Sequence, residues 1–313
     1  MNWVIIALAV DFGLRFVILG WPRITAPVRQ YKGGTGLYIF PGVLADARNQ
    51  VSPIWDVLHD YGRLFYGNLS RVLYSPWMIK HRFAKQIAQI DRKFELEQDV
   101  LVGISLGATI ALDVNDQLFK NDPHRQKPGL IVFDGVAGPE NLLSGGNVAG
   151  PVFRVLRWVP IGFVSGTVIG AVIALLQYLW INQVPKDAEI EDDILQGGQP
   201  VTKEDVKQKA KKDMAGYLFG VFARQMVHIS AGKVTPERLS RFAWIQYYEY
   251  TWHNVTVSQP AERRKWQEAA HKASVPFDLW QIEAPHVAFA QMPTATKKAL
   301  AQALPRFLSV ETQ

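Results

Sequence analysis

Short apolar runs alternate with stretches of helical periodicity from residue 36 to residue 134. Runs of this kind are typical of buried parallel strands, and the helical stretches between them are long enough to cross back over a sheet. The alternation therefore predicts an α/β fold with a mostly parallel central sheet and right-handed crossovers. The predicted strands are 36–41, 63–67, 99–105 and 129–134, and the predicted helices are 77–94 and 106–119.

The alternation stops after the fourth run and resumes near residue 254. Strand-like runs then return at 254–258 and 277–283, with helical patterns at 261–273 and 294–308. Because the two sides of the interval have the same pattern, we expect an insertion into one sheet. The expected organisation is an N-terminal apolar helix and linker at 1–32, an α/β core at 33–138 and 254–313, and a helical cap at 139–253.

The composition excludes several classes of protein. The 313 residues are 48% hydrophobic and 20% charged, so the chain can bury a core that needs no crosslink or metal. The absence of cysteine removes thiol nucleophiles, cysteine-based zinc sites and iron–sulfur clusters. The net charge is +6 and no nucleic-acid-binding motif accompanies it, so nucleic acid is not an expected partner.

The first 21 residues, MNWVIIALAVDFGLRFVILGW, are apolar enough to enter a membrane. A helix from Trp3 to Trp21 would be roughly 27 Å long, close to the thickness of a hydrocarbon core, and tryptophan is typical of both membrane interfaces. Asp11 and Arg15 lie one turn apart and could pair, which lowers the cost of insertion. The basic residues that follow would keep the rest of the chain cytoplasmic. The alternative is an amphipathic helix that packs on the domain or lies in the bilayer interface.

A second apolar stretch lies inside the predicted cap. Residues 158–185 carry no formal charge and are long enough to cross a bilayer. One crossing here would place strands of the same sheet on opposite sides of the membrane, so we expect a lid, that is, an apolar helix that covers part of the folded core, instead. The alternatives are a re-entrant or interfacial element, one half of a pair of crossings, and a cap helix over a small soluble substrate.

The motif Gly103-Ile-Ser105-Leu-Gly107 joins the third predicted strand to the helix that follows it. A serine between two glycines suits a sharp strand-to-helix turn, because the glycines relieve the crowding and the turn holds the hydroxyl outward. At this motif the chain resembles the α/β-hydrolase superfamily. The resemblance implies that Ser105 is the nucleophile, and the alternative is a glycine-rich turn with an inert serine.

The resemblance extends to Pro285-His286, just past the last predicted strand and before the terminal helix. The family carries its catalytic histidine at this place, and the order of serine before histidine also matches. His286 would then take the proton of the Ser105 hydroxyl and later return it to the leaving group, since a serine hydroxyl is too weakly acidic to attack unaided. The alternative is an imidazole that lies at the surface or caps a strand.

Two carboxylates are candidates for the acid that orients the histidine. The family's acid usually lies a few residues beyond the penultimate strand, where this chain has Glu262. Some members place the acid after the preceding strand, where this chain has Asp134. The alternative roles are a solvated carboxylate in a first helical turn for Glu262 and a strand-ending carboxylate that binds backbone amides for Asp134.

An oxyanion hole needs two backbone N–H groups aimed at the oxygen of the tetrahedral intermediate. By resemblance, one is the N–H of Leu106, and the other is the N–H of Val43 in the loop after the first predicted strand. Many members begin this loop with His-Gly, whereas this chain has Pro41-Gly42. The departure changes a side chain and keeps the amide of Val43.

These residues together predict a membrane-associated serine hydrolase whose catalytic domain is cytoplasmic. Its substrate would be a carboxylic ester or thioester of a lipophilic compound, and neither a metal nor an organic cofactor is implied. One alternative is a non-catalytic member of the fold that binds a lipid or a membrane partner. Another is an acyltransferase that uses the same residues.

Overall fold

The computed structural model describes the parts of the chain that carry its main sheet and the helices around that sheet. The described residues are 22–26, 34–43, 45–69, 74–136, 195–196, 199–200, 225, 228–229, 231–252, 259–285 and 293–308.

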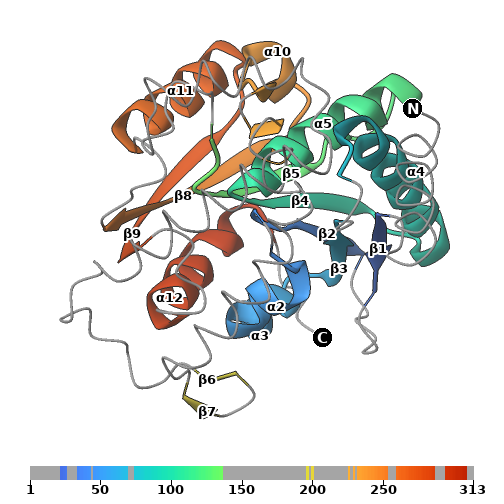
Figure 1. Cartoon of the computed structure of the whole chain (residues 1–313). Coiled ribbons are helices and arrows are strands. Elements are labelled where there is room, and N and C mark those ends of the chain that lie inside the picture. Colours follow the sequence, from blue (N-terminus) through green and yellow to red (C-terminus); the bar gives the residue numbers. More distant parts are fainter. Residues whose placement is uncertain are drawn as a thin grey trace, which may run out of the picture.

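A seven-stranded sheet forms the centre of the molecule (Figure 1), in the order β1-β3-β2-β4-β5-β8-β9. All neighbouring strands are parallel except the edge strand β1, which is antiparallel to β3. The predicted parallel sheet is therefore confirmed. The strands are β1 (Arg23–Thr25), β2 (Thr35–Phe40), β3 (Arg63–Asn68), β4 (Gln98–Ile104), β5 (Gly129–Phe133), β8 (Trp244–Trp252) and β9 (Phe277–Pro285).

Helices cover both faces of the sheet, which is why its central strands are continuously apolar. On one face lie α4 (Pro76–Phe94), α5 (Leu106–Asn121) and α11 (Gln259–Lys272), as Figure 1 shows. On the other face lie α2 (Ala47–Val51), α3 (Trp55–His59) and α12 (Pro293–Ala303). Each face has its own apolar core, represented by Phe83, Ile110 and Trp266 on the first face and by Leu58 and Leu300 on the second.

The remaining described elements are short. They are the 3-10 turns η1 (Ser52–Ile54) and η4 (Leu304–Arg306), the helix α10 (Pro236–Leu239), and a two-stranded antiparallel ladder of β6 (Leu195–Gln196) and β7 (Gln199–Pro200). Residues 1–21 and 158–185, for which we predicted an apolar helix and a lid, lie outside the described residues. No helix within the described residues is both long and apolar enough to cross a membrane.

The strand β8 corrects the sequence analysis. We expected the sheet to resume at 254–258, which lies outside the described residues, whereas β8 occupies Trp244–Trp252 between β5 and β9. The last part of the range assigned to the cap, 139–253, therefore belongs to the core sheet. The strand was missed because its sequence, WIQYYEYTW, contains buried polar groups: Gln246 and Glu249 are at most 3% exposed.

Candidate active site

Ser105 lies at the turn between β4 and α5, at the carboxyl edge of the sheet. Its backbone has φ 52° and ψ −111°, a conformation that a residue with a side chain adopts only under strain. The Ser105 N–H donates to the carbonyl of Phe133 (2.8 Å), and its carbonyl accepts from the N–H of Ala108 (3.0 Å). Neighbouring strand and helix therefore fix the strained turn from both sides.

Two glycines make this turn possible because backbone atoms occupy the space that a side chain would need. A Cβ atom on Gly107 would lie 1.9 Å from the carbonyl oxygen of Phe40 at the end of β2. A Cβ atom on Gly103 would lie 2.5 Å from the Cα of Ala108. The helix α5 can therefore begin directly against the sheet, with Ser105 at its first turn.

The loop after β2 lies against the serine. A Cβ atom on Gly42 would be 3.6 Å from the Cβ of Ser105, so this loop contacts the turn at Ser105 directly. Gln50, in α2, accepts the Gly42 N–H through its side-chain oxygen (2.9 Å) and so fixes this peptide. The next residue is the predicted donor Val43. The other predicted donor, Leu106, is the first residue of α5, where a helix has no carbonyl one turn earlier to accept its N–H.

Asp134 directly follows Phe133, the strand residue whose carbonyl accepts the Ser105 N–H. Its side chain is 1% exposed and its backbone has φ 46°. Its N–H donates to the carbonyl of Tyr248 (2.9 Å), and its Oδ1 accepts the N–H of Tyr250 (3.0 Å). Asp134 thus ties the end of β5 to the neighbouring strand β8, and it lies at the same edge of the sheet as the serine.

Glu262 lies in the first turn of α11 and is completely buried. A solvated first-turn carboxylate is therefore not what the structure shows. Glu262 is one of three carboxylates around the phenol of Tyr247, together with Asp134 and Glu249. Burial of the phenol and the negative charges of these carboxylates raise the pKa of Tyr247 well above its usual value. The structure therefore brings both candidate acids into one buried region, beside β8.

Glu249 was missed by the sequence analysis because the strand that carries it was assigned to the cap. Its carboxylate is 3% exposed, lies 3.2 Å from a guanidinium nitrogen of Arg263, and accepts a hydrogen bond from the side chain of Gln281 (2.8 Å). These partners fix it between α11 and β9. Gln50 was also missed, because an isolated glutamine in a short helix gives no sequence signal.

The predicted base, His286, lies outside the described residues. The strand before it, β9, ends at Pro285 and is parallel to β8, which is parallel to β5 and, through it, to β4. The carboxyl ends of β4 and β9 consequently lie at the same edge of the sheet. Among the described residues, no three histidine or carboxylate side chains are grouped to hold a metal ion.

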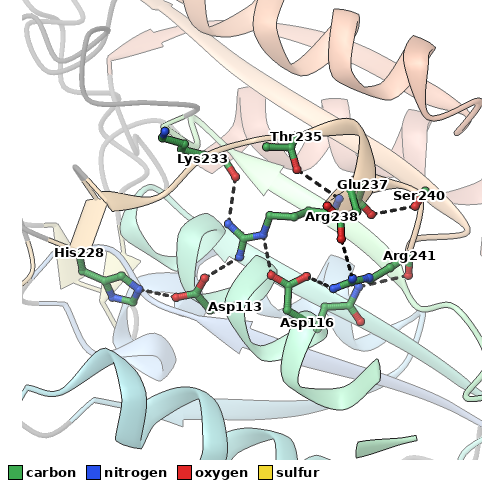
Figure 2. Close-up of polar contacts among 10 residues, drawn as sticks. Asp113, Asp116, His228, Lys233, Thr235, Glu237, Arg238, Ser240 and Arg241 are labelled. Atoms are coloured by element: carbon green, nitrogen blue, oxygen red, sulfur yellow. Dashed lines mark hydrogen bonds and ion pairs between the residues drawn. The ribbon is translucent and has the colours of Figure 1, made fainter. Parts of the chain in front are cut away.

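A polar network holds the outer side of α5, the helix that begins at the serine turn (Figure 2). Arg238 pairs with both Asp113 and Asp116 of α5, Arg241 pairs with Asp116 (2.7 Å), and His228 Nε2 lies 2.7 Å from Asp113. Burial favours a raised pKa for Asp113, but the hydrogen bonds and electrostatic interactions that it makes with His228 and Arg238 outweigh burial and hold the pKa below its usual value. The chain that leads into β8 is thereby fixed to α5.

Comparisons with known proteins give likenesses in structure alone. No protein-family model and no curated protein sequence matches the chain. Among solved structures, it is similar to an esterase, RhEst1, from Rhodococcus sp. ECU1013, with 13% identity and a TM-score of 0.55 over 92% of this chain and 96% of that one. It is also similar to MenH from S. aureus, with 10% identity and a TM-score of 0.58 over 91% and 98% of the two chains. A third likeness is to MGS-M2, an alpha/beta hydrolase enzyme from a Medee basin deep-sea metagenome library, with 13% identity and a TM-score of 0.55 over 90% and 92%.

Proposed function

For a chain with the α/β-hydrolase fold, we propose the activity of a serine hydrolase that cleaves a carboxylic ester or thioester through an acyl-enzyme intermediate. The observation that carries this proposal is the strained backbone of Ser105, held between β4 and α5 by two glycines that tolerate no side chain. Strain of this kind is found where function needs it, because an inert turn gains nothing from it. The esterases among the structural neighbours support the same activity.

The proposed reaction begins with attack of the Ser105 Oγ on the substrate carbonyl carbon while His286 takes the hydroxyl proton. The N–H groups of Val43 and Leu106 stabilise the negative oxygen of the tetrahedral intermediate. Its collapse breaks the bond to the leaving alcohol or thiol, which receives the proton from His286. Water then attacks the acyl-enzyme by the same route and releases the carboxylic acid. Glu262 or Asp134 orients His286 throughout.

We also propose a lipophilic substrate taken at a membrane. This part of the proposal is supported by the sequence of 1–21 and of 158–185, the two apolar stretches that gave the expectation of a membrane-associated enzyme with an apolar lid.

A fluorophosphonate probe tests the nucleophile, because it labels activated serines covalently. We expect labelling of the wild-type protein and hydrolysis of a short p-nitrophenyl ester, both lost in Ser105→Ala. The matched control is Ser274→Ala, since Ser274 also has a positive φ (54°) but lies beyond the end of α11. Labelling that persists in a folded Ser105→Ala variant, or a folded wild type that is never labelled, would reject the proposal and favour a lipid-binding member of the fold.

The pair Glu262→Gln and Asp134→Asn identifies the acid. An amide keeps the size of the side chain and, at Asp134, an oxygen that can still accept the Tyr250 N–H, so the fold is retained while the charge is lost. We expect one variant to lose about 10⁴-fold in kcat, as happens when a triad acid becomes an amide, and the other to change little. Equal, small losses in both folded variants would show that neither is the acid.

A further inference from the structure

One large apolar side chain stands out among the described residues because it faces solvent. Trp77, in the first turn of α4, is 66% exposed. Two features stabilise the start of this helix. The Ser75 side chain caps it by accepting the Met78 N–H, and Pro76 is the first helical residue. Tyr74, just before the helix, is buried, and its hydroxyl lies 2.7 Å from His228 Nδ1. Trp77 is therefore held in solvent by a firmly anchored helix start.

Trp77 lies beyond the same edge of the sheet as the nucleophile. The ring of Phe83, in α4, stacks on the ring of Phe40, the last residue of β2, with 5.6 Å between centroids. Trp77 is six residues before Phe83, so α4 extends about 9 Å past that edge to reach it. The carboxyl edge carries Ser105 as well, since β2 and β4 are parallel neighbours.

The helix around Trp77 is basic. Between Pro76 and Ile90 it carries Lys80, Arg82 and Lys85 and no acidic residue. Trp77, His81 and Lys85 follow one another at four-residue spacing and so share one side of the helix. An amphipathic aromatic ring beside positive charges complements the interface of an anionic bilayer, where tryptophan settles at headgroup depth and lysine meets lipid phosphates.

β1 begins, and β5 ends, at this same carboxyl edge of the sheet. The edge strand β1 is antiparallel, and Arg23 pairs with Asn68, the last residue of β3, so the chain preceding β1 joins the sheet at the carboxyl edge. The chain also leaves this edge at the end of β5, toward the part of the sequence that contains 158–185. The chain therefore enters β1 and leaves β5 at the edge that carries Trp77.

We propose that the exposed side of the first turns of α4, centred on Trp77, docks on an anionic lipid bilayer and turns the carboxyl edge of the sheet toward it. The benefit of docking rests on the proposed function, because this orientation would bring Ser105 to a substrate dissolved in lipid. Docking itself is independent of catalysis, so each can fail without the other.

The absence of cysteine allows a direct test in the full chain. A single cysteine introduced as His81→Cys, labelled with the environment-sensitive dye NBD, reports on the Trp77 side of α4. The control is Gln126→Cys, labelled in the same way, which is exposed in the turn between α5 and β5 at the opposite edge of the sheet. With phosphatidylglycerol-containing vesicles we expect the emission of the first label to rise and shift to the blue, and that of the second to stay unchanged.

Affinity for the same vesicles, measured by co-sedimentation, should fall about tenfold in Trp77→Ala and less in Trp77→Phe, and should be weaker for pure phosphatidylcholine. Fluorophosphonate labelling and hydrolysis of a soluble ester should be retained in Trp77→Ala. A silent label at position 81, equal responses at positions 81 and 126, or unchanged affinity in Trp77→Ala would each overturn the docking proposal. A label at position 81 that responds only to a protein partner would overturn it as well.

Discussion

The two edges of the sheet handle buried polar groups in different ways. At the carboxyl edge, Ser105 is held in a strained conformation by contacts that leave no room for a side chain at Gly107. At the amino edge, partly buried charged groups are paired with one another. Arg125 lies between Asp91 and Asp99, with 2.7 Å to the Asp91 carboxylate, and the hydroxyl of Tyr38 donates to Asp91.

The balance of charge at the amino edge is uneven, because two carboxylates share one guanidinium. Burial and the neighbouring charge of Asp91 raise the pKa of Asp99 to about 7, although Arg125 acts in the opposite direction. Each edge therefore contains a feature that lowers the free energy of unfolding, and the two features differ in kind. One edge accepts backbone strain beside the proposed nucleophile, and the other accepts a carboxylate that is costly to ionise.

The largest expected effect comes from closing the space at the carboxyl edge. Gly107→Ala would place a Cβ 1.9 Å from the Phe40 carbonyl oxygen, a backbone atom that cannot move alone. We expect a loss of about 4 kcal/mol or more in the free energy of unfolding, or no folded protein. The matched variant at the amino edge is Gly34→Ala, where the nearest atom is 3.2 Å away on the flexible Glu97 side chain. Urea unfolding of both should show a loss below about 1 kcal/mol for Gly34→Ala, and similar losses would contradict the contrast.

The next largest effect is expected when the ion pairs of Arg125 at the amino edge are removed. Arg125→Met keeps the length of the side chain but leaves two carboxylates near each other without their cation, so we expect a loss of about 3 kcal/mol. Proposed catalysis should be unaffected at temperatures where the variant is folded. A loss of less than about 1 kcal/mol by urea unfolding would mean that the Arg125 pairs are as weak as surface pairs.

Relief of strain at the carboxyl edge should stabilise the protein. Glycine tolerates the backbone of Ser105, so Ser105→Gly should raise the free energy of unfolding by about 2 kcal/mol while it abolishes activity. Ser105→Ala should lose activity without this gain, because alanine keeps the strain. The comparison is Glu95→Gly at the amino edge, where φ 50° and ψ 48° form an ordinary left-handed helix cap, and the gain should be smaller, about 1 kcal/mol. No gain in Ser105→Gly would show that the turn is not strained.

The smallest effect is a change in pH dependence. The raised pKa of Asp99 means that its ionisation costs more in the folded than in the unfolded state. Its contribution is therefore favourable below its ordinary pKa, about 4, and is lost as the pH rises toward about 7. Asp99→Asn should flatten this part of the stability curve, so that the variant gains stability over wild type at pH 8 relative to pH 4. Urea unfolding of both proteins between pH 4 and pH 8 tests this prediction. An equal change in the free energy of unfolding at every pH would show that the substitution acts through packing and not through ionisation.

Sequence predicted the parts of this molecule that are specified locally. The turn at Ser105 needs glycines on both sides and an apolar strand before it, and these signals lie within ten residues of each other. Most strands of the sheet were found within one residue or two for the same reason. β8 could not be found in this way, since its buried Gln246 donates to the carbonyl of Ala303, a partner far along the chain.

The surroundings of the site depend on such distant partners as well. Glu262 is buried in α11, a helix that contacts β8, and the contact of Gln50 with Gly42 comes from the fold of the loop after β2. Neither residue type is expected to be buried from composition alone. The local pattern thus predicts the turn at Ser105, whereas the placement of the groups around it depends on how distant strands pair.

β5 and β8 are neighbours in the sheet, with Gly129 opposite Trp244 and Phe133 opposite Tyr248. In the sequence, however, β5 ends at Phe133 and β8 begins only at Trp244. Closing so long a loop costs little more entropy than closing one of half the length, but it must occur before the last two strands can add to the sheet. On the ribosome, the first five strands are synthesised well before β8 and β9 emerge. The nascent sheet therefore has an open apolar edge at β5 during synthesis, and this edge is the expected site of contact with chaperones.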